Sequence, residues 1–113
     1  MTQMADKVAI VTGGGSGMGR ASSVLFAQEG AAVAVADLNE DGGQQTVAMI
    51  EQAGGRASFI HTDTGDESSI IQLVEQTAAT YGRVDAMVTA AGISYSNFME
   101  KDEATDPWLN PGE

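Results

Sequence analysis

Apolar residues gather in four short runs along the chain, and a longer stretch with helical spacing follows each of the first three. The first two runs consist mostly of valine, alanine and isoleucine, which is typical of strands that are covered on both faces. The runs fall at residues 7–12, 32–37, 57–61 and 84–89. Each connection is too long for a hairpin and reads as a helix, so we expect a parallel sheet with right-handed crossovers.

The three connecting stretches carry the end signals of helices. The first runs from about residue 17 to 29, while Asn39 and Asp66 can cap the second and third by accepting hydrogen bonds from first-turn amides. Glycines that suit the left-handed residue after a helix follow each stretch, at Gly30, Gly54, Gly55 and Gly82. Helical spacing predicts that the inner face of the first helix contains Ala21, Val24 and Leu25.

This succession predicts a single, partial Rossmann-type α/β domain over residues 1–113. Its sheet would have four parallel strands in the order 3-2-1-4, with helices on both faces, and would stop before the second half of a doubly wound fold. Residues 94–113 lose the periodicity and read as an irregular acidic tail. Within this tail, residues 105–108 resemble a helix start, with Pro107 at the first helical position.

A four-stranded half-domain would leave the strand at residues 84–89 as an apolar open edge, which favours pairing with another chain. Two explanations follow from this edge. The chain is either a truncated piece of a longer protein or a short product that is stabilised by self-association. In both cases we expect a homo-oligomer.

Composition and charge mainly exclude classes of function. Sixteen acidic and five basic residues give a net charge of −11, which disfavours nucleic acid and anionic membranes as partners. No apolar run is long enough to span a membrane, and the first residues lack the features of a secretory signal. The absence of cysteine fits a cytoplasmic protein. His61 is the single histidine and lacks companions at ligand spacing, so we expect no metal site.

A glycine-rich loop follows the first predicted strand and opens the first predicted helix, with the sequence Thr12-Gly13-Gly14-Gly15-Ser16-Gly17-Met18-Gly19. Glycines allow a tight turn and a close approach of the backbone to a phosphate pair. The helix start supplies unpaired amides and the positive end of its dipole. Gly19 would let the helix lie close against the strands. The loop therefore predicts a pyrophosphate site.

An acidic residue, Asp37, ends the second predicted strand 18 residues after Gly19. A carboxylate at this point can accept hydrogen bonds from both ribose hydroxyls of an adenosine and would repel a 2′-phosphate. Ser16 and Leu38 are uncharged, and Arg20, the nearby base, lies beyond the loop within the helix. The sequence therefore favours NAD over NADP as the cofactor.

These motifs resemble the short-chain dehydrogenase/reductase family over about residues 5–110, which corresponds to the first half of a usual member. The resemblance rests on the spacing Thr-Gly-x-x-x-Gly-x-Gly, on Asp37, on Asp63-Thr64 and on Ala91-Gly92. It implies that Asp63 binds the adenine amino group with help from the Thr64 amide. The implied cofactor residues are Thr12, Gly13, Gly15, Ser16, Gly17, Met18, Gly19, Asp37, Leu38, Asp63, Thr64, Ala90, Ala91 and Gly92.

The chain departs from the family pattern at two places. Where the family has Asn-Asn-Ala-Gly, residues 89–92 read Thr-Ala-Ala-Gly, which removes two amide side chains that brace the central strands. The family also transfers hydride with a serine and a Tyr-x-x-x-Lys pair, and neither Tyr81 nor Tyr95 is followed by lysine at that spacing. Ser94 and Ser96 lie in an earlier loop than the family's serine. No catalytic residue can therefore be assigned.

Three functional hypotheses remain open. The first is the NAD-binding part of an oxidoreductase that acts on an alcohol/carbonyl pair, with a small-molecule substrate only if a second half exists. The second is a nucleotide-binding or self-associating module without hydride transfer. The third is a methyltransferase that binds S-adenosylmethionine, which the Thr12-Gly13-x-x-x-Gly17 spacing disfavours.

Overall fold

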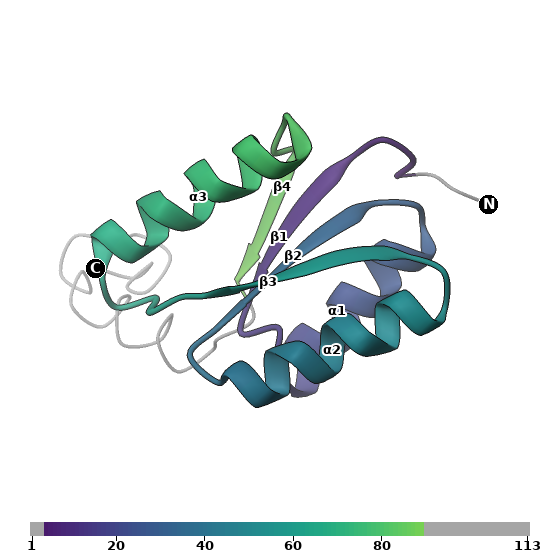
Figure 1. Ribbon diagram of the computed structural model, residues 1–113, viewed down its shortest axis with the longest axis horizontal. Helices are drawn as coiled ribbons and strands as arrows, with labels where there is room; N and C mark the ends of the chain where they lie inside the picture. The colour runs from purple at the N-terminus through teal and green to yellow at the C-terminus, as the bar shows by residue number, and fades with distance from the viewer. Residues whose placement is uncertain (1–3, 90–113) are drawn as a thin grey trace, which may run out of the picture.

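The computed structural model describes residues 4–89, in which strands and helices alternate along the chain (Figure 1). Its elements are β1 (Val8–Thr12), α1 (Gly17–Gln28), β2 (Ala32–Asp37), α2 (Glu40–Gln52), β3 (Arg56–His61), α3 (Glu67–Tyr81) and β4 (Ala86–Thr89). Every strand and helix predicted between residues 7 and 89 is present, and each observed boundary lies within two residues of the predicted one. The acidic tail predicted at residues 94–113 lies outside the described residues.

The four strands form one parallel sheet in the order β3-β2-β1-β4, which confirms the predicted topology. Thr12 at the end of β1 is paired with Ala36 on one side and with Thr89 on the other. Asp37 at the end of β2 is paired with His61 at the end of β3. The carboxyl ends of the strands thus lie together at one end of the sheet, where open α/β sheets bind their ligands.

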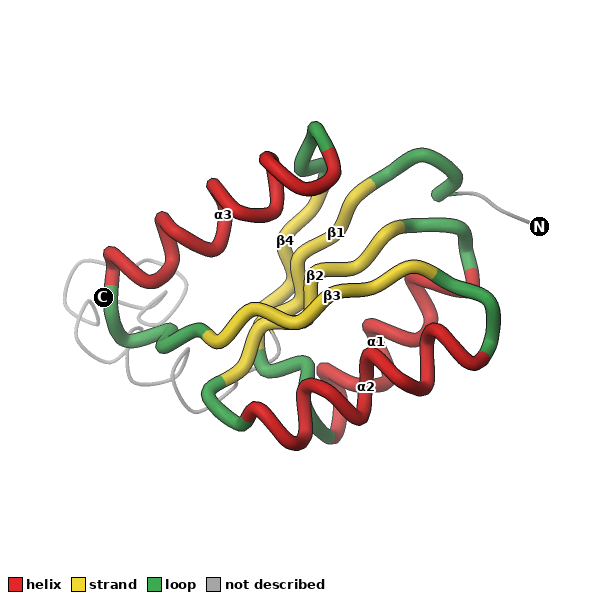
Figure 2. Tube along the Cα trace, in the orientation of Figure 1, coloured by secondary structure: helices red, strands yellow, loops and turns green. Residues whose placement is uncertain are grey.

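Helices cover both faces of the sheet, as the sequence predicted. Helices α1 and α2 lie on one face and α3 lies on the other (Figure 2). The α1/α2 side has a buried cluster of aliphatic side chains from Val11, Val33, Val35, Val47 and Ile50. The α3 side has a second cluster from Ile10, Ala34, Ala36 and Leu73. The central strands β1 and β2 are therefore buried on both sides, which explains their continuous apolar sequence.

The inner face of α1 differs from the predicted one. Leu25 is 53% exposed and Ala21 is also exposed, whereas Gly19 and Ser23 are buried. Val24, the third predicted residue, does pack against the core, together with Phe26 and Ala27. The reason is the close approach at Gly19, where a Cβ would collide with the Gly13 carbonyl group. This contact turns the small residues Gly19 and Ser23 toward the sheet and leaves Leu25 exposed.

Glycines end the helices as expected. Gly30, Gly54 and Gly82 have φ angles of 103°, 88° and 86°, a region in which a side chain would be strained. Asn39 and Asp66 cap α2 and α3 with their side chains. The sequence signals at the helix ends are therefore confirmed.

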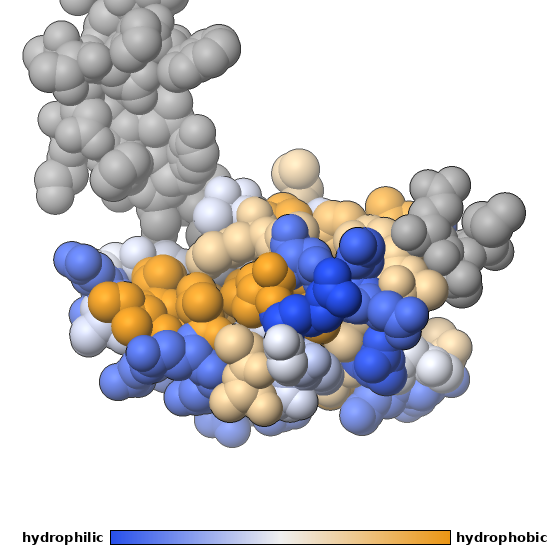
Figure 3. Space-filling view, turned by 90° about the horizontal axis from the view of Figure 1, so that it is seen from above, coloured by the Kyte–Doolittle hydropathy of each residue, from blue (hydrophilic) through white to orange (hydrophobic). Residues whose placement is uncertain are grey.

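The α3 side of the molecule exposes several large apolar residues (Figure 3). Ile71 and Val74 on α3 are 49% and 37% exposed, and Met87 on the edge strand β4 is 40% exposed. Within the described residues β4 is an open edge of the sheet, as predicted. None of the helices within residues 4–89 has the length and apolar character to cross a membrane.

Candidate functional site

The loop between β1 and α1 is held against the end of β2 by its own backbone. The N–H groups of Gly13 and Gly14 donate to the Ala36 carbonyl oxygen at 2.8 and 3.2 Å. Gly13 has a φ of 71°, a conformation that glycine adopts easily. A Cβ at Gly14 would lie 2.8 Å from Cγ1 of Val35. A side chain is therefore disfavoured at Gly13 by the backbone conformation and at Gly14 by the lack of space.

The N-terminus of α1 differs from those of α2 and α3 because no side chain within residues 4–89 caps it. Ser16 occupies the cap position without a side-chain hydrogen bond, and the first turn of α1 has no acidic residue. By contrast, Asn39 accepts the Gly42 N–H at 3.1 Å at the start of α2. Asp66 accepts the Ser68 N–H at 3.0 Å at the start of α3. The first amides of α1 are thus suited to an anion, which the helix dipole also favours.

The backbone at this helix start leaves room for a ligand. Gly17 has a φ of 55°, and apart from its chain neighbours and the α1 backbone no atom lies within 4 Å of the position that a Cβ would occupy there. Met18, the next residue, is 80% exposed. Thr12 precedes the loop, is buried, and donates its hydroxyl to the Val88 carbonyl oxygen of β4 at 3.4 Å. An approaching phosphate would therefore meet backbone at Gly17.

The carboxylate of Asp37 lies directly beside the loop. Its Oδ2 accepts the Gly15 N–H at 2.8 Å, and its Oδ1 accepts the Asn39 N–H at 2.9 Å. A Cβ at Gly15 would lie 2.8 Å from Oδ2, so glycine is needed for this contact. Each carboxylate oxygen has further lone pairs, and Asp37 is only partly buried, so the group can accept additional hydrogen bonds. Leu38, which follows it, is 58% exposed.

Arg20 turns toward α2. Its Nη2 donates to the Gly15 carbonyl oxygen at 2.7 Å and to the Gly42 carbonyl oxygen at 3.2 Å. Its Nε donates to the Thr46 hydroxyl at 3.0 Å, and Nη2 also contacts the Gln45 side-chain oxygen at 3.2 Å. The guanidinium is thus engaged with loop and helix rather than extended toward solvent.

Asp63 and Thr64 follow β3 at the same end of the sheet. The Thr62 N–H donates to the Asp37 carbonyl oxygen at 3.0 Å, which brings the two strand ends together. The Asp63 side chain is exposed and its Oδ1 accepts the Gly65 N–H at 2.9 Å, so this residue caps its own turn. The turn places Asp63 near the site without assigning it a ligand. The remaining predicted residues, Ala90, Ala91 and Gly92, lie outside the described part of the chain.

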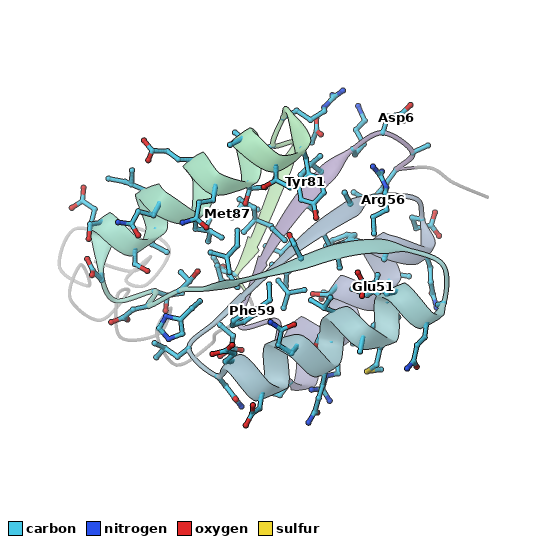
Figure 4. The ribbon with its side chains drawn as sticks, in the orientation of Figure 1. Asp6, Glu51, Arg56, Phe59, Tyr81 and Met87 are labelled. Carbon is cyan, nitrogen blue, oxygen red and sulfur yellow. The ribbon has the colours of Figure 1, made fainter. Side chains whose placement is uncertain are left out.

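Sequence reasoning missed the contribution of α2 to the site. A Cβ at Gly42 would lie 2.6 Å from the Gly15 carbonyl oxygen, and a Cβ at Gly43 would overlap the ring of Phe59. Phe59 points from β3 toward this end of α2 (Figure 4). Two consecutive glycines inside a helix are unfavourable by propensity, and this was the available signal that the helix start lies against other groups.

Two titratable groups with shifted pKa values, Arg83 and Asp85, lie at the opposite end of the sheet, where β1 and β4 begin. Hydrogen bonds from Arg83 and from the Val8 N–H lower the pKa of Asp85, and the same pairing raises the pKa of Arg83. The Arg83 Nη2 lies 2.7 Å from the Asp85 Oδ1. Between residues 4 and 89 no cluster of three or more potential metal ligands occurs.

Comparison with known protein families assigns the chain to a family. The family model described as short chain dehydrogenase matches residues 7–110, which is most of the chain. The chain belongs to the short-chain dehydrogenase family. The resemblance inferred from the loop motif is thereby confirmed.

Individual short-chain dehydrogenases align with the same region. A (-)-isopiperitenol/(-)-carveol dehydrogenase of Mentha piperita is 50% identical over 91 residues, covering 80% of this chain and 34% of its own length. A cyclopentanol dehydrogenase of Comamonas sp. is 44% identical over 93 residues, covering 82% and 37%. The crystal structure of a hydroxysteroid dehydrogenase from Escherichia coli superposes with a TM-score of 0.76 at 34% identity, covering 78% and 37%. The chain thus spans little more than a third of the length of these short-chain dehydrogenases.

Proposed function

We propose that the edge formed by the glycine loop, Asp37 and Asp63 is the adenosine and pyrophosphate half of an NAD site. It would serve a short-chain oxidoreductase that acts on an alcohol/carbonyl pair. When bound, NAD supplies the hydride acceptor. The residues of this chain would bind and orient the cofactor, with the α1 amides at the pyrophosphate and Asp37 at the adenosine ribose.

The observation that carries this proposal is the contact between the Asp37 carboxylate and the Gly15 N–H at 2.8 Å. It joins the ribose-binding acid of the motif to the phosphate-binding loop in one structural unit. It also supports NAD over NADP, because a 2′-phosphate at this point would face a carboxylate. Arg20, the nearby base that follows the loop motif, makes its hydrogen bonds to Gly15, Gly42, Gln45 and Thr46 instead.

A second candidate is nucleotide binding without hydride transfer by this chain alone. It is favoured by the sequence, since no Tyr-x-x-x-Lys pair occurs in these 113 residues. The open edge at β4 and the exposed Met87 beside it support self-association in this case. Self-association, the cytoplasmic location and the substrate all stay predictions.

Three measurements on the purified chain test the cofactor site, the turnover and the self-association. Calorimetric titration with NAD, NADP and S-adenosylmethionine tests the site, and we expect NAD to bind most tightly. A preference for S-adenosylmethionine would support the methyltransferase hypothesis and overturn the NAD site. Incubation with NAD and a panel of secondary alcohols tests turnover, and steady NADH formation would exclude the non-catalytic module. Light scattering of the same sample reports the oligomeric state.

A further inference from the structure

We propose that Arg20 is a positioning residue that holds the glycine loop in its phosphate-binding form by fastening it to the first turn of α2. This role rests on the NAD site proposed above. It assigns a function to a side chain that the loop motif itself does not include. The contacts of Arg20 and of its neighbour Thr46 carry the argument.

The guanidinium of Arg20 joins loop and helix through carbonyl oxygens. Its Nη2 lies 2.7 Å from the Gly15 oxygen and 3.2 Å from the Gly42 oxygen. Its Nε donates to the Thr46 hydroxyl at 3.0 Å, and that hydroxyl lies 2.7 Å from the Gly14 carbonyl oxygen. Thr46 is fully buried. Two consecutive loop carbonyls are therefore held from the α2 side, one by arginine and one through threonine.

These bonds determine the direction of the loop amides. In a trans peptide the C=O and N–H groups point in opposite directions. The peptide between Gly14 and Gly15 is held at both ends, because Thr46 faces its oxygen and Asp37 accepts its N–H. The peptide between Gly15 and Ser16 is held at its oxygen by Arg20, so its N–H must point away from α2. Because glycine rotates easily, loss of this bond would let the second peptide turn over.

The charge of Arg20 supports the same role. A cation in the first turn of a helix opposes the helix dipole, so Arg20 does not serve the stability of α1. Among residues 4–89, the carboxylate salt bridge is the one between Arg83 and Asp85, and the partners of Arg20 are neutral oxygens. Within the described residues the guanidinium therefore contacts the loop and α2 and forms no ion pair.

The test compares ligands with and without phosphate. Arg20→Met removes the donors and the charge while keeping an unbranched apolar side chain. Arg56→Met is the matched control, because Arg56 also donates Nη2 to a glycine carbonyl, that of Gly30 at 3.4 Å, and is exposed. We expect Arg20→Met to raise the Kd for ADP and NAD roughly tenfold or more, on the scale of a hydrogen bond to a charged group. Adenosine, which lacks phosphate, should bind both variants and the wild type alike.

Other outcomes would overturn the proposal in distinguishable ways. Equal ADP affinity in Arg20→Met and wild type removes the positioning role and leaves the NAD site intact. A uniform loss for ADP and adenosine identifies Arg20 as a merely structural residue. Failure of the wild type to bind ADP and NAD overturns the NAD site itself, and the positioning role with it. If Arg20→Met does not fold, Arg20→Lys and Thr46→Val carry the same comparison, with a smaller loss of the same selectivity expected.

Discussion

Asp37→Ala tests the proposed cofactor preference most directly. The mutation removes the proposed acceptor for the ribose hydroxyls at the end of β2. Because hydrogen bonds to a charged group contribute about 1.5–3 kcal/mol, the Kd for NAD should rise roughly 10- to 150-fold. Calorimetric titration of wild type and variant measures this change.

The same mutation should affect NADP differently. Two unit charges 4 Å apart repel each other by about 1 kcal/mol in water and about 4 kcal/mol at an effective dielectric constant of about 20. Asp37→Ala removes this repulsion, which for NADP offsets the lost hydrogen bonds. The Kd for NADP divided by the Kd for NAD should therefore fall. Asp41→Ala is the control for net charge, because Asp41 is an exposed acid in the first turn of α2. It should leave this ratio unchanged.

Part of the effect of Asp37→Ala will act on the fold. The Gly15 N–H loses its acceptor, which costs about 1–3 kcal/mol if the amide stays buried. Urea unfolding of each variant measures this cost and shows that the titrations were made on folded protein. Asp37→Asn keeps one carbonyl oxygen for the Gly15 N–H, but it loses the charge and replaces the oxygen that accepts the Asn39 N–H by an NH2 group. Comparison of Asp37→Asn with Asp37→Ala therefore isolates the loss of the Gly15 contact. An unchanged Kd for NAD in folded Asp37→Ala would remove Asp37 from the ribose and withdraw the NAD preference.

Three further changes test the glycine loop, the contact between α2 and Phe59, and the Arg83–Asp85 pair. Gly17→Ala places a methyl group at a φ of 55°, so the free energy of unfolding should fall by about 1–2 kcal/mol. ADP binding should weaken as the methyl group enters the proposed phosphate space, and undiminished affinity would count against the loop assignment. Gly43→Ala drives a methyl group against Phe59, so the Tm should drop by an amount equivalent to about 1–3 kcal/mol. Gly43→Ala combined with Phe59→Leu should recover part of this loss, and an unchanged Tm in the single variant would contradict the contact. The pKa of Asp85 is lowered from its ordinary value of 3.8, so its stabilising effect is present above that value and is lost as the pH falls below it. The urea midpoint of Asp85→Asn should therefore depend less on pH in this acid range than that of the wild type. Parallel plots of midpoint against pH for variant and wild type would refute this.

Local sequence patterns were sufficient to predict the order of the strands and helices and the position of the glycine loop. Buried strands have continuous apolar sequences, and helix ends have short-range capping signals, as at Asn39 and Gly82. Both depend on neighbours in the chain, so they can be recognised without knowing the packing. The strand order followed because parallel crossovers allow few topologies.

Local sequence patterns could not predict how the helices pack against the sheet and against each other. Helical spacing assigned Leu25 to the interior, but the contact between Gly19 and the Gly13 carbonyl group rotates α1 so that small residues face the sheet. The bonds of Arg20 to α2 likewise join residues more than twenty positions apart. They depend on how closely two helices approach, which a single sequence does not reveal.

The contacts that shape the loop also bear on the order in which the protein folds. Gly15 and Asp37 are 22 positions apart and Arg20 and Thr46 are 26 apart, whereas Val8 and Asp85 are separated by 77. Closing a short loop costs less chain entropy than closing a long one. The unit from β1 to α2, which contains the proposed nucleotide site, can therefore close before β4 pairs with β1. Since synthesis proceeds from the N-terminus, a dinucleotide bound at the proposed site would stabilise this unit while the later strands are still being made.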